Sequence, residues 1–212
     1  MNILNTKYYQ IYNYVISESK LSLNLLEIIK YCNHVREKYS SVKKSNVTGW
    51  QSPDFNINHN HKFFDYGVIP LISQAVENYR NVIGLKKRLD VSNYWINYNY
   101  KNSYNREHVH PYSIVSAVYY VQTPRDSGNF RIINPEEHIL NFYLTRLTLK
   151  HRERNDDMLF DMKNEVTRSL LSQSYPLVPR QNNLFIFPSW MKHSVETNYS
   201  DDTRISIAFN FD

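Results

Sequence analysis

Two pairs of histidines stand out among the residues that could bind a metal ion. His108 and His110 lie two positions apart in REHVHPYS, and His59 and His61 have the same spacing in NINHNHKF. On a β-strand, residues i and i+2 point to one face with Cβ atoms roughly 7 Å apart, so two such imidazoles can bind one ion. We expect the first pair on a strand. The second pair lies in an Asn-rich loop, where solvent-facing histidines are expected.

Residues further along the chain add a third imidazole and a cation to the first pair. His193 ends the stretch NLFIFPSWMKH, and Arg204 follows it at the start of RISIAFNF. Three histidines on two strands can occupy one face of an Fe(II) ion and leave three adjacent positions open for chemistry. The single cysteine, Cys32, excludes multi-cysteine metal sites, so a metal here must rely on imidazole and carboxylate ligands.

Length and composition predict one domain with a hydrophobic core, because the chain has 212 residues of which 42% are hydrophobic. The net charge of +5 arises from 25 basic and 20 acidic residues with no run of five like charges, which is a weak indication of nucleic-acid binding. No apolar run approaches the ~20 residues that span a bilayer, and the opening residues lack a signal pattern. We therefore expect a soluble, cytoplasmic protein.

The N-terminal part of the chain favours helices that could support a sheet. Residues 8–16, YYQIYNYVI, are expected to form a strand. Helical spacing behind a Ser22 cap then predicts a first helix whose buried residues are Leu25, Ile28 or Ile29, Cys32 and Val35. A second helix is expected from about Gly67 to Gly84, with the apolar positions Ile69, Ile72, Val76, Tyr79, Val82 and Ile83.

From Asn93 onward the chain consists of short β-type runs, several of them separated by turn formers such as PRDSG and NYSDD. Two helices followed by about seven strands predict a mainly β (α+β) sandwich or jelly roll with helices that brace one sheet. We divide the single domain into helical support at 17–90, a jelly-roll core at 93–135 and 175–212, and an insertion with helical spacing at 138–174.

The last predicted strand indicates which face is which, because strand side chains alternate. One face consists of Ile205, Ile207, Phe209 and Phe211, and the other of Arg204, Ser206, Ala208 and Asn210. The apolar face should meet the core. In a jelly roll the polar face would line the inside of the barrel, where an arginine needs an anion.

The segments SNVTGWQS, NREHVHPYSIVSAVYYVQTPRDSGNFRIINP, NNLFIFPSWMKHSVETN and RISIAFN resemble the 2-oxoglutarate and Fe(II)-dependent oxygenases of phages and marine bacteria, which are relatives of the prolyl 4-hydroxylases. The resemblance covers residues 45–135 and 175–211. It implies a double-stranded β-helix (jelly roll, cupin-like) and an enzyme that uses Fe(II), 2-oxoglutarate and O2. Such an enzyme hydroxylates its substrate and releases succinate and CO2.

The resemblance also implies roles for individual residues. His108 and His193 would be the first and distal iron ligands. The distal carboxylate of 2-oxoglutarate would be held by Arg204, Ser206 and Tyr120. Tyr98 resembles a tyrosine near the metal-binding end of the cosubstrate.

His110 stands where most of the superfamily has Asp or Glu. Its spacing from His108 favours it as the second ligand, although Glu107 or Asp126 could serve instead, or the position could be lost as in related halogenases.

Two other classes of function fit parts of the sequence. A cupin-like metal protein without 2-oxoglutarate would keep the three histidines but would not need Arg204 inside the barrel. A viral nucleic-acid-binding or structural protein would account for the basic charge and the 18 tyrosines, but not for the aligned histidines. The substrate, a small molecule or a protein side chain, is not indicated. The insertion at 138–174 is expected to be either a solvated surface element or a lid over the site.

Overall fold

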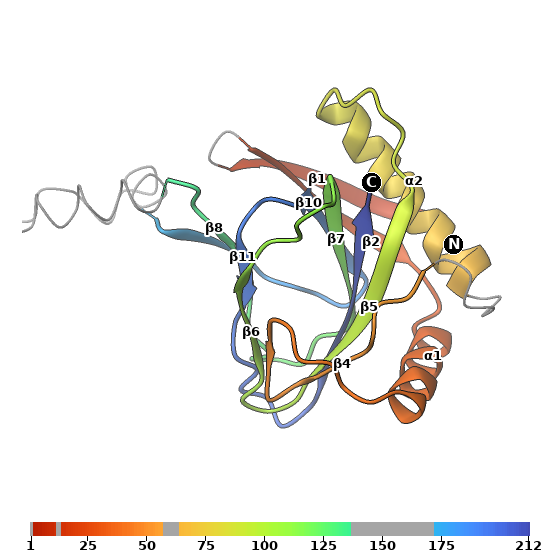
Figure 1. The fold of residues 1–212 in the computed structure, drawn as a ribbon, viewed down its shortest axis with the longest axis vertical. Coiled ribbons are helices and arrows are strands. Elements are labelled where there is room, and N and C mark those ends of the chain that lie inside the picture. The colour runs from red at the N-terminus through yellow and green to blue at the C-terminus, as the bar shows by residue number, and fades with distance from the viewer. Residues whose placement is uncertain (1, 12–13, 57–63, 137–171) are drawn as a thin grey trace, which may run out of the picture.

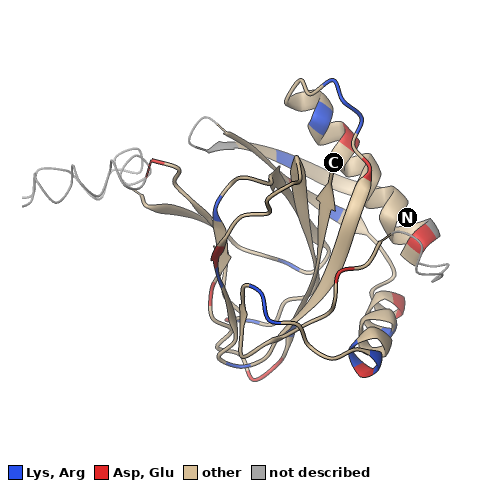
Figure 2. Cartoon of the chain, viewed as in Figure 1, with Lys and Arg blue, Asp and Glu red and all other residues tan. Residues whose placement is uncertain are grey.

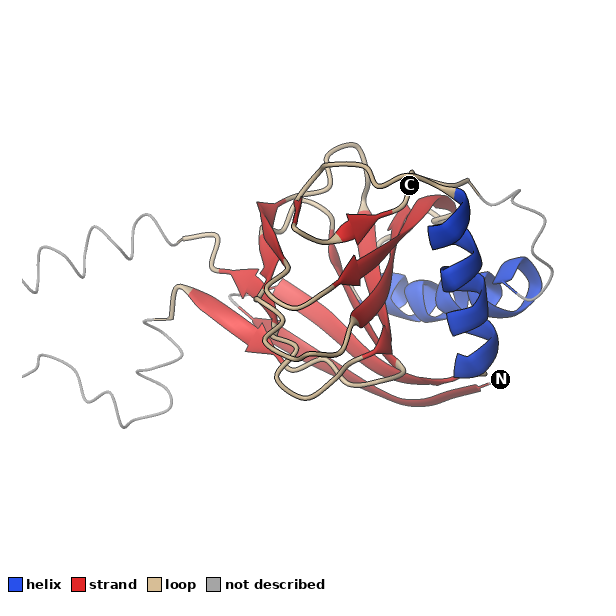
Figure 3. Cartoon of the chain, turned by 90° about the horizontal axis from the view of Figure 1, so that it is seen from below, coloured by secondary structure: helices blue, strands red, loops and turns tan. Residues whose placement is uncertain are grey.

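The fold consists of two antiparallel β-sheets that face each other, with both helices on the outer side of the larger sheet (Figures 1 and 3). The computed structural model describes residues 2–11, 14–56, 64–136 and 172–212. This architecture confirms the predicted mainly β jelly roll with bracing helices.

The larger sheet has seven strands and the smaller sheet has five. In spatial order the larger sheet contains β1 (Asn2–Ile11), β2 (Tyr14–Ser22), β10 (Asn183–Pro188), β7 (Val115–Gln122), β12 (Arg204–Phe211), β5 (Val91–Asn99) and β4 (Trp50–Gln51). The smaller sheet contains β3 (Asn46–Val47), β6 (Tyr104–His108), β11 (His193–Val195), β8 (Phe130–Ile133) and β9 (Ser174–Leu177). The remaining elements are α1 (Leu25–Lys38), the short π-helix η1 (Phe64–Val68) and α2 (Ile69–Val82).

Helix α1 packs through the stripe that its sequence spacing predicts. It buries Ile28, Tyr31, Cys32 and Val35. The helix does not begin behind Ser22, because Ser22 is the last residue of β2 and Asn24 occupies the cap position. The predicted cap is therefore wrong by two residues. Of the predicted buried positions, Ile28, Cys32 and Val35 are buried and Leu25 is half-buried, while the buried Tyr31 was not predicted.

Helix α2 follows η1 and ends where the sequence predicts. Pro70 lies in its first turn, where a missing backbone N–H removes no intrahelical bond. Gly84 has φ +71°, a left-handed conformation that glycine adopts without steric cost and that commonly ends a helix. The apolar stripe ends at Tyr79, since Val82 and Ile83 are exposed. Neither helix, nor any other in the described ranges, is long and apolar enough to cross a membrane.

The single strand expected at residues 8–16 is instead the end of one strand and the start of the next. Strands β1 and β2 pair antiparallel, with Tyr8 opposite Ser17 and Tyr9 opposite Ile16. Strand β2 then pairs with β10, so this hairpin extends the larger sheet. The sequence did not reveal the hairpin because the run is rich in β-forming residues throughout and contains no Gly or Pro to mark a turn.

Strand β12 lies between β5 and β7, and both of its faces are buried. The apolar face, Ile205, Ile207, Phe209 and Phe211, joins the core formed with α1 and α2. The other face turns away from the helices into the barrel and consists of Arg204, Ser206, Ala208 and Asn210. The predicted orientation of this strand is confirmed.

The barrel interior has its own apolar cluster, distinct from the core under the helices. The cluster includes Val118, Tyr120, Phe130, Phe185 and Phe187. The rings of Phe130 and Phe185 stack with centroids 5.8 Å apart. One part of the interior is thus filled by aromatic side chains, while β12 lines another part with polar ones.

The insertion predicted at 138–174 joins two neighbouring strands of the smaller sheet. Ile133 of β8 pairs with Ser174 of β9, and the Asn134 N–H donates to the Gln173 carbonyl at 2.8 Å. The strand that follows the insertion is therefore β9, whereas His193 arrives later on β11. Most of the insertion, residues 137–171, lies outside the described residues, so the lid hypothesis stays a prediction.

The packing of β12 against the helices predicts a large cost for truncating Phe209. Its ring is fully buried and packs against Phe64 and Tyr94, with centroids 6.3 and 5.8 Å away. We expect Phe209→Ala to lower the free energy of unfolding by about 3–5 kcal/mol in urea denaturation. Val82→Ala, at a position that is 52% exposed on α2, should change it by less than about 0.5 kcal/mol. A cost for Phe209→Ala as small as that of the control would contradict this packing.

Candidate metal centre

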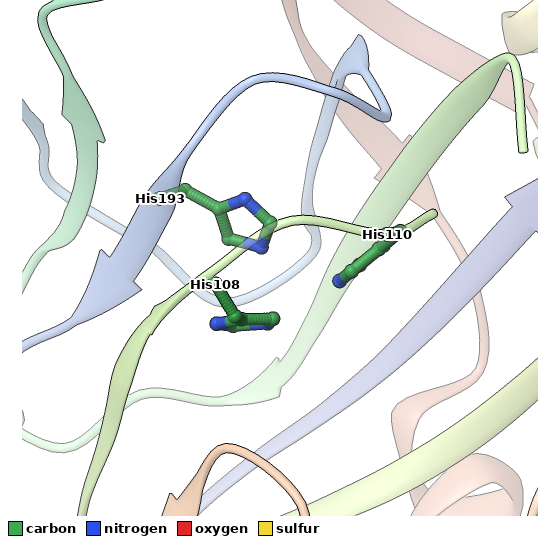
Figure 4. A group of neighbouring side chains, drawn as sticks. All are labelled: His108, His110 and His193. Atoms are coloured by element: carbon green, nitrogen blue, oxygen red, sulfur yellow. The ribbon is translucent and has the colours of Figure 1, made fainter. Parts of the chain in front are cut away.

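The structure brings His108, His110 and His193 together at one end of the barrel, with their rings turned toward a common space (Figure 4). One ring nitrogen from each residue lies within 4.8 Å of the other two. Ring centroids are separated by 4.2 Å for His108 and His193, and by 4.9 Å for His110 and His193. Among the residues that the structure describes, this is the only group of three or more His, Cys, Asp or Glu side chains that could hold a metal ion.

Two of the histidines face each other across a strand pair. His193 of β11 is directly opposite His108 of β6. The Nδ1 atom of His108 lies 2.7 Å from the Arg106 carbonyl, and that of His193 lies 2.9 Å from the Met191 carbonyl. A carbonyl oxygen can only accept, so each Nδ1 carries the hydrogen and each Nε2 keeps a free lone pair. Both rings are therefore oriented to bind a metal through Nε2.

His110 reaches the cluster by a different route from the one expected. Strand β6 ends at His108, so His110 is not on the same strand face but on the loop that follows. Its backbone N–H donates to the Ser189 carbonyl at 2.9 Å, which ties the loop to the chain after β10. The Nδ1 atom lies 2.8 Å from Asn210 Oδ1 and 2.7 Å from Ser116 Oγ. The buried Nε2 has no hydrogen-bond partner among the described residues.

Burial keeps the three imidazoles neutral, which is the form that binds metal ions. Desolvation lowers the pKa of His108 below its ordinary value. It lowers the pKa of His110 to about 4, and the neighbouring His108 adds to this effect. The pKa of His193 is depressed well below the usual range by burial and then by the other two histidines.

The carboxylates considered as alternative ligands lie elsewhere. Glu107 is exposed, and its carboxylate is 3.9 Å from the Lys192 ammonium. Asp126 is in an exposed turn at φ +61°, beside Arg125. Neither belongs to the histidine cluster. The geometry thus favours His110 over both as the third ligand.

Arg204 is fully buried in the barrel with part of its guanidinium unpaired. Its Nη1 donates to the Ser127 carbonyl and, at 3.3 Å, to the Glu196 carbonyl. Its Nε and Nη2, like the buried hydroxyl of Tyr120, have no hydrogen-bond partner within the described part of the chain. Burial lowers the pKa of Arg204 and raises that of Tyr120 to about 12. Because unpaired buried donors are costly, this arrangement fits an anion such as a carboxylate.

Tyr98 does not join these residues. Its side chain is on the helix-facing side of β5, where its hydroxyl donates to Asn33 Oδ1 of α1 at 2.8 Å. The expectation that Tyr98 lies near the cosubstrate is therefore wrong in geometry.

Asn97, which was not among the predicted site residues, lies on the barrel side of β5 directly opposite Ser206. The buried Asn97 Oδ1 has no hydrogen-bond partner in the described ranges. The strict alternation in NYWINYNY, which places Tyr98 and Asn97 on opposite faces, could have revealed this.

His108 and His110 line a cavity of about 620 Å³, within the range of small-molecule sites. Trp95 lines it and packs edge-on against His110, with ring centroids 5.2 Å apart. Lys44 Nζ lies 5.9 Å over the Trp95 ring and 2.7 Å from both carboxylate oxygens of Asp54. Elsewhere, acidic and basic positions occur on both helices and on loops around the barrel (Figure 2).

Residues 93–210, more than half of the chain, match the model of a protein family described as "Putative 2OG-Fe(II) oxygenase". The matched region contains all three clustered histidines and Arg204. The chain therefore belongs to the 2-oxoglutarate and Fe(II)-dependent oxygenase family, as the resemblance predicted. Its cofactor is Fe(II), and its cosubstrates are 2-oxoglutarate and O2.

Solved structures similar to this chain have the same fold at low sequence identity. The non-heme alpha-ketoglutarate-dependent carbocyclase SnoK from nogalamycin biosynthesis is 14% identical, with a TM-score of 0.61, and the match covers 92% of this chain and 78% of SnoK. A prolyl-4-hydroxylase from Pseudomonas putida is 12% identical, with a TM-score of 0.60 and coverage of 95% and 94%.

The viral collagen prolyl hydroxylase from Paramecium bursaria Chlorella virus-1 is 11% identical, with a TM-score of 0.55 and coverage of 92% and 94%. No curated protein matches the chain in sequence. These similarities identify the fold as the double-stranded β-helix of this oxygenase family.

The depressed pKa of His110 predicts how the stability of the metal-free protein depends on pH. Between the folded-state pKa of about 4 and the unfolded value of about 6.5, the unfolded chain binds a proton that the folded chain excludes. Stability is therefore lost as the pH falls through this window. At pH 5, His110 alone should account for a loss of about 2 kcal/mol relative to neutral pH.

Urea denaturation of the metal-free protein at pH 7 and pH 5 measures this loss. The His110→Gln variant retains the carboxylates that titrate over the same range and should lack the His110 contribution. An identical pH dependence in both proteins would show that His110 titrates normally in the folded state.

Proposed function

We propose that this enzyme hydroxylates a C–H bond of a small molecule or of a protein side chain, with conversion of 2-oxoglutarate and O2 to succinate and CO2. One observation carries the proposal: the same barrel holds three imidazoles with free Nε2 atoms and an arginine with two unpaired donors. When bound, Fe(II) supplies the oxidative chemistry, because it activates O2 while 2-oxoglutarate provides electrons through its decarboxylation. The residues of the chain bind and orient the reactants.

In this proposal His108, His110 and His193 would hold the iron through their Nε2 atoms. The donor set fits, since imidazole is a good ligand for Fe(II) and three ligands on one face leave the other positions for reactants. The carbonyls of Arg106 and Met191 fix two of the rings. The cavity that borders the cluster is the expected place for the substrate.

Arg204 is proposed to bind the distal carboxylate of 2-oxoglutarate through Nε and Nη2. The Tyr120 hydroxyl is a further donor to the same carboxylate, and Ser206, which pairs with Tyr120 in register, lies beside it. Asn97 is opposite Ser206 on β5, and Trp95 beside His110 is the next interior residue of that strand. Asn97 therefore lies between Arg204 and the histidine cluster, where it can contact the middle of a 2-oxoglutarate molecule that extends from one to the other.

The aromatic filling of the barrel has a role in excluding water. Phe187 and Phe130 pack against the His193 ring, with centroids 4.7 and 5.4 Å away. Trp95 covers the edge of His110. A reaction centre enclosed in this way strengthens electrostatic contacts with the cosubstrate and limits unproductive reactions with water.

Arg204 also separates this proposal from the two other classes of function. A metal protein that does not bind 2-oxoglutarate would not require a buried arginine with unpaired donors. A structural protein would not require three clustered histidines. The solved relatives include prolyl hydroxylases and a carbocyclase of nogalamycin biosynthesis, so both protein and small-molecule substrates stay within the proposal.

We expect His108→Ala and His193→Ala each to abolish iron-dependent succinate formation, because two ligands rarely hold Fe(II) tightly. His110→Ala should lose most of it. The measurement is succinate released from 2-oxoglutarate in air, with and without added Fe(II). Replacing His59 and His61 together by Ala, at positions outside the described residues, should change little. An equal loss of succinate formation in the His59 and His61 double variant and in the variants of the clustered histidines would contradict the ligand assignment.

Arg204→Lys should weaken 2-oxoglutarate binding by about 1 to 3 kcal/mol, because lysine keeps the charge but loses the planar pair of donors. Iron binding should persist. A weak visible charge-transfer band is expected when Fe(II) and 2-oxoglutarate bind together without oxygen. Titration of this band with 2-oxoglutarate gives the cosubstrate affinity, and its appearance at saturation shows that iron is still bound. Unchanged cosubstrate affinity would remove Arg204 from the proposed site.

A further inference from the structure

The three clustered imidazoles are not held in the same way. Backbone carbonyls two residues earlier in the chain orient His108 and His193. His110 is instead oriented by side chains, through contacts of its Nδ1 with Asn210 and Ser116. The backbone carbonyls of residues 106 and 191 remain when their side chains are substituted. The contacts of His110, in contrast, require Ser116 on β7 and Asn210 on β12.

The hydrogen bonds around His110 are consistent with only one position of its proton. Asn210 Oδ1 can only accept, so the His110 Nδ1 that lies 2.8 Å away must carry the hydrogen. The Ser116 hydroxyl donates to the same Oδ1 at 2.9 Å, which leaves the Ser116 oxygen to accept. Ser189 Oγ, 2.8 Å from Ser116 Oγ, can then donate to it. His110 Nδ1, Asn210 Oδ1 and the hydroxyls of Ser116 and Ser189 are thus all hydrogen-bonded, and His110 Nε2 carries no hydrogen.

The network draws on parts of the chain that are far apart in sequence. Ser116 on β7 and Asn210 on β12 are directly opposite in register, and Ser189 follows β10. The Ser189 carbonyl also accepts the backbone N–H of His110. All four residues are buried. Both the backbone and the ring of His110 are thus fixed by strands of the larger sheet, although His110 itself lies on a loop.

We propose that Asn210, Ser116 and Ser189 form a positioning network that fixes the Nδ1–H tautomer and the ring orientation of His110, and so lets a neutral imidazole from a loop complete the metal site. This inference rests on the proposed function, in which His110 is a ligand. None of the three residues contacts the metal. They act through His110, as outer hydrogen-bond partners act on metal-bound histidines elsewhere.

Metal titration tests the network without relying on activity. Co(II) is added to the metal-free protein without oxygen, and its visible absorption reports both affinity and coordination geometry. We expect Asn210→Ala and Ser116→Ala each to weaken Co(II) binding about 10-fold, and the double variant about 100-fold, the range for loss of such partners. The spectrum of the double variant should change, because an untethered ring alters the geometry around the ion.

Asn210→Asp keeps the acceptor of Asn210 and strengthens it, because a carboxylate forms a charge-assisted hydrogen bond. The two side chains have nearly the same shape, and the carboxylate still accepts from His110 Nδ1–H. This variant should bind Co(II) at least as tightly as the wild type. If Asn210→Asp lowers Co(II) affinity 10-fold, as Asn210→Ala is expected to do, the proposed acceptor role is wrong. This comparison uses single variants only, so it does not depend on folding of the double variant.

Asn183→Ala is the matched control for loss of a buried amide. Asn183 is at the other end of β10 and donates to Glu18 Oε1 at 2.8 Å, remote from the histidines. Its replacement should lower the free energy of unfolding and leave Co(II) affinity and spectrum unchanged.

The outcomes separate the network from the proposed function. If the Ser116 and Asn210 variants bind Co(II) like the wild type while His108→Ala does not, the network proposal is wrong and the ligand assignment stands. If the wild type and His108→Ala bind Co(II) equally poorly, the ligand assignment itself fails.

Discussion

Strand β12 lies between β5 and β7, and its register fixes both the core under the helices and the lining of the barrel. Hydrogen-bonded on both edges, this strand presents its apolar face to the helices and its polar face to the barrel interior. Arg204 begins the polar face, and Asn210, next to His110, is near its end. A slip of one residue in register would turn Arg204 toward the helices and place isoleucine in the barrel. The register that stabilises the core therefore also sets the spacing between the arginine and the metal centre.

In the proposed site, a metal ion and Arg204 would be two positive groups at opposite ends of the barrel face of β12. At one end, the three neutral imidazoles that we propose as ligands would leave the charge of Fe(II) uncompensated, and at the other Arg204 is buried with unpaired donors. Among the described residues, the carboxylates that act on these ends are the half-buried Glu196, which acts on Arg204, and Asp54, which acts on His110. A dianion long enough to span the two ends compensates both charges at once. Binding of metal and of 2-oxoglutarate should accordingly favour each other, since each lowers the cost of burying the other.

The sequence predicts those elements in which the spacing of apolar residues matches the side of the element that is buried. The spacing of Ile28, Cys32 and Val35 and the alternation from Arg204 to Phe211 each match one face to one environment, so both orientations follow from pattern alone. Tyr98 and His110 were harder for opposite reasons. The alternation in NYWINYNY separates the face of Tyr98 from that of Asn97, but both faces of this strand are buried, so burial alone does not show which one lines the barrel. His110 lies beyond the end of β6, and its position depends on a tertiary contact with Ser189 that local sequence does not encode.

The three histidines of the candidate metal centre come from two kinds of structure, a strand pair and a loop. His108 and His193 are opposite each other in a strand pair, and their rings are fixed by the backbone. His110 comes from a loop beside the cavity, and Val109 and Tyr112 of the same loop are exposed around it. Loops beside a site commonly carry specificity, while strands carry precision. In the proposed site this loop would line the substrate cavity and also deliver a ligand, so it needs an anchor independent of its own conformation. Hydrogen bonds from His110 to residues of the larger sheet give it that anchor.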